Sequence, residues 1–131
     1  MWLAMSGVGS GRGMGPSHAI GHTLGGTYGI PHGVTSCIIL PAVLKWSEAF
    51  ATERQALVSD LMGAHGTPAS EAVKQLVVAL DLPADLKSVG IGSESFQAIA
   101  EHTLHDAGVR TGARPIKGAD DIVEILRLAA G

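Results

Sequence analysis

The stretch from residue 15 to residue 33 reads GPSHAIGHTLGGTYGIPHG and holds three of the six histidines of the chain, His18, His22 and His32. Residues four apart in a helix lie on one face, so His18 and His22 are predicted to stack their imidazoles on the same side. Pro31 disfavours helical backbone at the residue before it, which predicts a turn that folds His32 back towards that pair. Because neutral imidazole is a good ligand for zinc or ferrous iron, the sequence predicts a metal pocket.

The histidine spacing alone leaves a second interpretation open. A single histidine in an apolar, glycine-rich helix can be a packed residue whose ring is satisfied by one hydrogen bond. Short motifs also produce false positives when nothing else accompanies them. The metal interpretation therefore needs support from other residues.

Glycine recurs at positions 7, 9, 11, 13 and 15, just before the histidines. Each glycine costs about 1 kcal/mol relative to alanine in a helix interior. The series lacks the G-x-G-x-x-G spacing of a dinucleotide-binding loop, because the sixth position is Arg12, Met14 or Pro16. Close packing against a neighbouring helix is the favoured explanation, and a glycine-rich ligand loop is the alternative.

Apolar residues recur at helical spacing and no stretch alternates with the period of a strand, so the predicted fold class is all-α, a helical bundle. Helices are predicted from Trp2 to about Leu24, from Val34 to Trp46 and from Glu53 to Met62. Three apolar stripes predict the later helices. They consist of Val73, Leu76, Val77 and Leu80, then of Phe96, Ile99, Ala100, Thr103, Leu104 and Ala107, and finally of Ile122, Ile125, Leu126 and Ala129.

The residues at the ends of these stripes predict where the later helices begin and stop. Thr67 is the predicted N-cap of the first, with Pro68 at its first helical position. Ser93 is the predicted N-cap of the second, and Gly108 its stop. Asp120 and Asp121 suit the positive end of the last helix dipole.

Composition limits the other function classes. With 131 residues and 46% of them hydrophobic, residues 1–131 are expected to form one all-helical domain with its own core. A net charge of −3 and 4% aromatic residues argue against nucleic acid as a partner. The apolar run 34–44 is about half of the ~20 residues that a membrane-spanning helix needs. One cysteine and no secretory signal at the start predict a cytoplasmic protein.

Residues 13–46, GMGPSHAIGHTLGGTYGIPHGVTSCIILPAVLKW, resemble the signature of the iron-containing alcohol dehydrogenase family. The variant Leu24-Gly25-Gly26 is similar to its maleylacetate reductase branch. A second resemblance, to the C-terminal helix of the family, lies in residues 109–115, VRTGARP, and in the Asp-rich helix start that follows them. Nearly all of the chain falls inside the resemblance.

The resemblance implies an all-helical domain that carries a metal and follows a dinucleotide-binding domain. Only the helical domain is expected here. His18 and His32 match two metal ligands of the family, and His22 matches a histidine near the nicotinamide and the reacting carbon. The two other ligands of the family, an aspartate and a histidine on an earlier helix, have no counterpart, because the chain starts after them.

Three functions are therefore considered. The resemblance implies an NAD(P)-dependent oxidoreductase, although NAD(P) is not expected to bind this chain alone. The second is a stand-alone hydrolase that uses a divalent Zn, Fe or Mn ion bound by histidines. The metal-bound hydroxide would attack a small activated ester or phosphotriester, and His22 would be a third ligand or the general base. The third is a non-enzymatic fragment that packs against a missing domain. Apolar surface left open by absent helices predicts a homodimer.

Other residues that could carry chemistry are interpreted as surface. His102 and His105, with Glu101 and Asp106, fall on the polar side of an amphipathic helix, where a solvated face is expected. No G-x-S-x-G motif occurs, so a serine hydrolase has no support.

Overall fold

The computed structural model describes residues 13–131, and these form helices and turns without a strand. The predicted all-α class is confirmed. The α-helices are α2 (Gly15–Tyr28), α3 (His32–Ser47), α4 (Thr52–Leu61), α5 (Ala69–Ala79), α6 (Phe96–Thr103) and α7 (Ala119–Leu128). The 3-10 turns are η1 (Glu48–Phe50), η2 (Lys87–Val89), η3 (Ser93–Ser95) and η4 (Ala107–Arg110).

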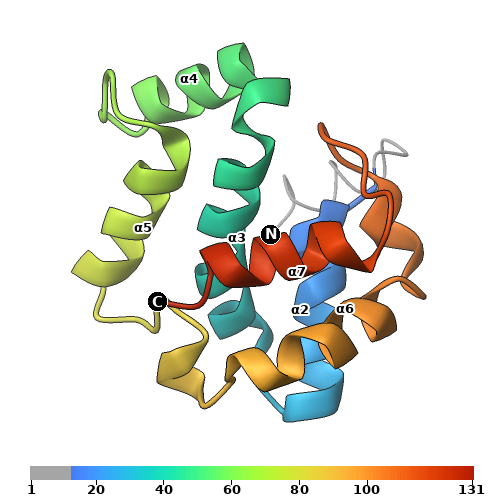
Figure 1. Cartoon of the computed structure of the whole chain (residues 1–131). Helices are drawn as coiled ribbons and strands as arrows, with labels where there is room; N and C mark the ends of the chain where they lie inside the picture. The colour runs from blue at the N-terminus through green and yellow to red at the C-terminus, as the bar shows by residue number, and fades with distance from the viewer. Residues whose placement is uncertain (1–12) are drawn as a thin grey trace.

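Helices α2 and α3 form an antiparallel pair at the centre of the molecule (Figure 1). Helix α7 crosses α3, and α6 packs against both α2 and α7. The α4 and α5 helices lie on the other side of α3, with α5 in contact with it (Figure 1). The α2–α3 pair is thus covered on both sides.

The turn between α2 and α3 follows from two residues. Gly29 ends α2 in the left-handed conformation (φ 70°), where its N–H donates to the carbonyl of Gly25 at 3.1 Å. Pro31 has extended backbone and stands directly before α3, whose first residue is His32. The predicted turn before His32 is confirmed.

Gly21 lets α2 and α3 approach closely. A Cβ atom at Gly21 would lie 3.0 Å from the side-chain oxygen of Thr35, which is tighter than ordinary van der Waals contact. Thr35 is itself fully buried on α3. The close packing of the two helices brings the histidines on their facing turns together.

One hydrophobic cluster forms the core. The members on α2 and α3 are Ala19, Ile20, Leu24, Ile38, Ile39, Ala42 and Trp46. They meet the third predicted stripe, Ile122, Ile125, Leu126 and Ala129, every member of which is buried. In the second stripe, Phe96, Ile99, Ala100 and Thr103 are buried and Ala107 is exposed.

The first helix differs from its prediction. Residues 2–12 lie outside the described part of the chain, Gly13 and Met14 are not helical, and α2 continues past Leu24 to Tyr28. Its first residue, Gly15, has a φ of +78°. This left-handed backbone cannot continue a right-handed helix.

The predicted close packing of the glycines holds at two positions, although the neighbour is not a helix. A Cβ atom at Gly13 would overlap the side chain of Thr111, and one at Gly15 would lie 3.1 Å from the Thr111 carbonyl. The N–H of Gly15 donates to the Thr111 hydroxyl at 3.1 Å. Gly7, Gly9 and Gly11 lie outside the described residues.

The stripe of Val73, Leu76, Val77 and Leu80 predicts a helix, and α5 is present, but most of the stripe does not face the core. Val77 is buried, whereas Leu76 and Leu80 are 50% and 60% exposed. Helix α5 instead packs its small residues inward, Ala69 and Ala72. Small side chains allow a close approach to α3, and this rotates the leucines outward.

Three helix boundaries also differ from their predictions. Helix α5 starts at Ala69, so Pro68 takes the N-cap position in place of Thr67 and no side chain caps the helix. Ser93 begins the turn η3 and does not cap α6, which starts at Phe96 and ends at Thr103, before Gly108. Asp120 and Asp121 occupy the first turn of α7, as predicted.

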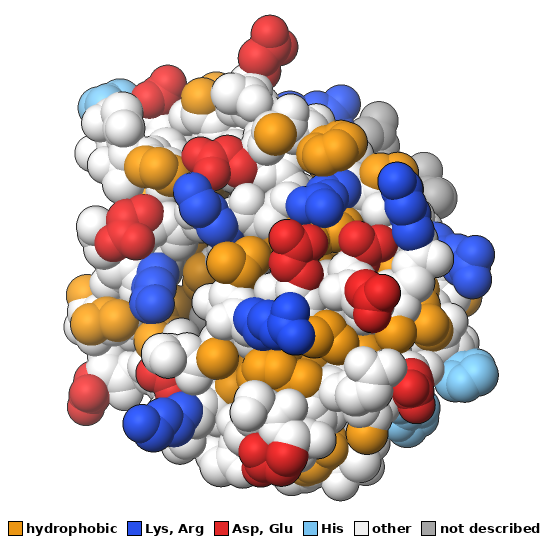
Figure 2. Space-filling view, viewed as in Figure 1, with side chains coloured by type: hydrophobic (Ala, Val, Ile, Leu, Met, Phe, Trp, Pro, Cys, Tyr) orange, Lys and Arg blue, Asp and Glu red, His pale blue; other side chains and the backbone are white. Residues whose placement is uncertain are grey.

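Several large apolar side chains are exposed on α4, on α5 and directly after α5. They are Leu57, Val58, Leu61, Leu76, Val78, Leu80 and Leu82. Figure 2 shows hydrophobic side chains at the surface along the left side of the molecule, over α5. Among the described residues, no helix is both long and apolar enough to span a membrane.

Candidate metal centre

The three histidines of the opening stretch meet where α2 faces the start of α3. The rings of His18 and His22 lie 5.3 Å apart between centroids, one turn apart on α2 as predicted. The ring of His32 lies 4.6 Å from that of His18 and 5.9 Å from that of His22. The fold therefore brings together all three residues that the sequence singled out.

His18 and His32 point their Nε2 atoms at each other, 3.2 Å apart. At this distance one imidazole nitrogen can donate a hydrogen bond to the other, or both nitrogens can bind the same atom between them. Burial lowers the pKa of the His18 ring, and the charges of His32 and His22 lower it further, while Asp106 raises it. A lowered pKa favours neutral imidazole, the form that binds metals.

His22 turns its Nδ1 away from this pair, to Asp106. The distance from Nδ1 to the carboxylate Oδ2 is 2.8 Å, and the two residues are 84 positions apart in the sequence. The other oxygen of Asp106, Oδ1, accepts the backbone N–H of Gly108 at 2.7 Å. The hydrogen bond from His22 is the main cause that lowers the pKa of Asp106, followed by the one from Gly108.

Asp106 is the residue that sequence reasoning missed. The sequence places Asp106 with His102 and His105 on a solvated helix face, but α6 ends at Thr103 and Asp106 contacts His22 of α2. His102 lies near the same surface, with its Nδ1 3.3 Å from the hydroxyl of Thr27. Because His22 and Asp106 are far apart in the sequence, their contact leaves no local spacing pattern from which it could be predicted.

A cavity of about 390 Å³ opens beside the histidines. Its lining includes the polar side chains of His18, His22 and Asp106 together with Met14, Ala107 and Thr111. The lining is mostly apolar with a few polar groups, as in many small-molecule sites.

The described residues do not form a metal site by themselves. No group of three or more His, Cys, Asp or Glu side chains in residues 13–131 is arranged so that it could hold one ion. The converging nitrogens are those of His18 and His32. In the printed sequence, no aspartate or histidine precedes His18.

The structure is that of an all-helical domain with a pair of converging histidines, and the sequence matches the model of a known family. Residues 1–130 match the model of the C-terminal part of the Fe-containing alcohol dehydrogenase family. The chain belongs to this family.

Individual relatives agree with this assignment. The dehydrogenase FUM7 of Gibberella moniliformis is 37% identical, over 75% of this chain and 27% of that protein. The structure of an alcohol dehydrogenase from Oenococcus oeni is 31% identical with a TM-score of 0.80, over 88% of this chain and 32% of the other. Maleylacetate reductase from Rhizobium sp. is 28% identical with a TM-score of 0.76, over 90% and 32%. The chain thus spans less than a third of the length of FUM7 and about a third of the two solved structures.

Proposed function

We propose that residues 1–131 form a single helical domain that supplies two metal ligands and one substrate-facing histidine to an NAD(P)-dependent oxidoreductase of small alcohols or carbonyl compounds. The observation that carries the proposal is the convergence of His18 and His32 in a chain that belongs to a dehydrogenase family. The relatives named above are redox enzymes by their names.

The geometry of the histidine pair fits a metal. A zinc–nitrogen bond measures about 2.0–2.1 Å, so two nitrogens on one ion lie at most about 4.2 Å apart. The two Nε2 atoms, 3.2 Å apart, satisfy this limit. A metal held by His18 and His32 would polarise the oxygen of an alcohol or carbonyl group. Iron, zinc and manganese all accept imidazole ligands.

The remaining ligands and the dinucleotide are supplied, in this proposal, by parts of an oxidoreductase other than these 131 residues. Two histidines are fewer than the three protein ligands usual for catalytic zinc. His22 lines the cavity with His18, so its ring would lie beside a substrate bound there. The isolated chain is expected neither to bind NAD(P) tightly nor to reduce carbonyl substrates.

A chimaera tests this function. Residues 13–130 would replace the matched third of the alcohol dehydrogenase from Oenococcus oeni, whose fold this chain shares. We expect NADH-dependent reduction of short aldehydes by the chimaera, none by the 131-residue chain, and a loss of at least about 100-fold in the chimaera with His32→Ala.

The control is His65→Ala, which removes an exposed histidine outside the cavity. A chimaera that folds, binds NADH and contains metal but lacks activity would contradict the proposal. Such an outcome would favour the non-enzymatic fragment. The hydrolase alternative gains no support from the relatives, and robust ester hydrolysis by the isolated chain would revive it.

We also propose that the exposed leucines of α4 cover each other in a homodimer of the 131-residue chain. Leu57 and Leu61 are four residues apart on one face of α4 and are 58% and 80% exposed. A two-fold axis through such a face pairs the same leucines from both copies.

Sedimentation of the purified chain checks this. We expect a dimer, and a dissociation constant at least about tenfold higher for the double variant Leu57→Lys and Leu61→Lys, because like charges would meet across the axis. Gln97→Lys, which adds a lysine on α6, should leave the dimer unchanged. A wild-type chain that stays monomeric at high protein concentration would refute the dimer.

A further inference from the structure

The carboxylate of Asp106 is held from two sides, which makes it a fixed partner for His22. Its Oδ1 accepts a hydrogen bond from the backbone N–H of Gly108, a group that can only donate. Its Oδ2 is then left for Nδ1 of His22 at 2.8 Å. An ionised carboxylate only accepts hydrogen bonds, so Nδ1 of His22 has to carry the proton.

A neutral imidazole has one proton, and the nitrogen that lacks it offers a lone pair. With the proton on Nδ1, Nε2 of His22 becomes the basic nitrogen. From this geometry we infer that Asp106 is a positioning residue that fixes His22 in the Nδ1–H tautomer and keeps a lone pair on Nε2 for a proton of the substrate.

This inference rests on the proposed function, in which His22 lies beside the substrate, but the tautomer itself does not. The cavity beside the histidines is lined by both His22 and Asp106, so the pair faces the space where a small molecule would bind. The side chains of His22 and Asp106 are 48% and 27% exposed, and the pair is reachable from solvent.

The substitution Asp106→Asn gives a sharp test, because asparagine has nearly the same shape but only one accepting oxygen. The Gly108 N–H requires that oxygen, so the amide NH₂ group faces His22 and donates to Nδ1. The proton of His22 should then move to Nε2. Fold and turn should be preserved, since the contact with Gly108 remains.

The measurement is nitrogen-15 NMR of the metal-free 131-residue protein labelled on histidine, at about pH 9, above the range in which histidine side chains usually titrate. Protonated and unprotonated ring nitrogens have well-separated shifts, and His22→Gln identifies the signals of His22. We expect predominantly Nδ1–H in the wild type and predominantly Nε2–H in Asp106→Asn.

A matched control is available in the His65–Asp60 pair, where Nδ1 and Oδ1 are 2.9 Å apart. Asp60→Asn should leave the signals of His22 unchanged. An Nε2–H tautomer in the wild type, or an unchanged Nδ1–H tautomer in Asp106→Asn, would overturn the inference. Because the protein is metal-free and no turnover is measured, such a result would leave the oxidoreductase proposal standing, and an inactive chimaera would leave the tautomer result standing.

Discussion

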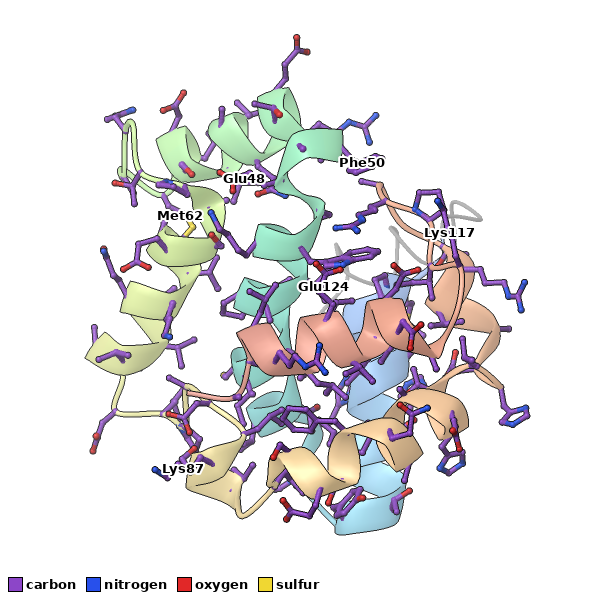
Figure 3. The ribbon with its side chains drawn as sticks, in the orientation of Figure 1. Glu48, Phe50, Met62, Lys87, Lys117 and Glu124 are labelled. Carbon is purple, nitrogen blue, oxygen red and sulfur yellow. The ribbon has the colours of Figure 1, made fainter. Side chains whose placement is uncertain are left out.

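Replacement of Trp46 with alanine is expected to lower the free energy of unfolding by about 3–5 kcal/mol, the range seen when a large buried aromatic side chain is removed. Trp46 is 5% exposed in the last turns of α3. Its indole N–H donates to Glu124 of α7 at 2.8 Å. Figure 3 shows Glu124 on the side of α7 that faces the end of α3.

Arg114 adds to the effect of this substitution. Its guanidinium lies 3.9 Å from the centre of the Trp46 ring, and it donates to the Trp46 carbonyl at 2.9 Å. An arginine stacked on an aromatic ring contributes about 0.5–2 kcal/mol. Trp46 therefore joins α3 to α7 and to the loop that precedes α7, which carries Arg114. Alanine would remove all contacts of the indole ring at once.

Urea unfolding followed by circular dichroism measures the change. Trp46→Phe is the matched variant: it keeps an aromatic ring under Arg114 but loses the indole N–H and the second ring. Because Glu124 is 54% exposed and can bind water instead, Trp46→Phe should cost about 1 kcal/mol. A loss below about 1 kcal/mol for Trp46→Ala would show that the ring does not support the core.

Replacement of His32 with alanine is expected to weaken zinc binding by at least about 100-fold, equivalent to about 2.7 kcal/mol. Changes outside the ligand shell typically cost 10–100-fold, and the loss of one of two converging ligands should cost more. The Nε2 of His18 would remain without its partner at 3.2 Å.

Titration calorimetry with Zn²⁺ on the 131-residue chain and on the chimaera measures this loss. Zinc that binds the folded state also raises the melting temperature, and the rise should vanish in His32→Ala. His65→Ala should retain wild-type affinity, since His65 is paired with Asp60 outside the cavity. Equal zinc affinities for His32→Ala and the wild type would remove His32 from the site.

The parts of the fold that sequence predicted best are those in which local pattern and burial agree. Ile122, Ile125 and Leu126 repeat at helical spacing and are all buried. The stripe on α5 has the same spacing but is turned outward at Leu76 and Leu80. A stripe shows which residues share a face, but the face that packs inward is chosen by neighbours, here by the fit of small residues against α3.

In the candidate site, too, some features follow from local sequence and others do not. The spacing of His18 and His22 and the turn before His32 are local, and the structure confirms both. Asp106 reaches His22 only because α6 ends early and η4 packs against α2. Nothing in the neighbourhood of either residue in the sequence encodes that contact.

This difference in sequence separation has a kinetic consequence. The two Nε2 atoms of the histidine pair belong to residues 14 positions apart, whereas His22 and Asp106 are 84 positions apart. Contacts between near positions close with a smaller loss of chain entropy and form earlier. The chain can thus assemble the pair of His18 and His32 while α6 and η4 are still unfolded, and the hydrogen bond between His22 and Asp106 forms only when η4 docks on α2.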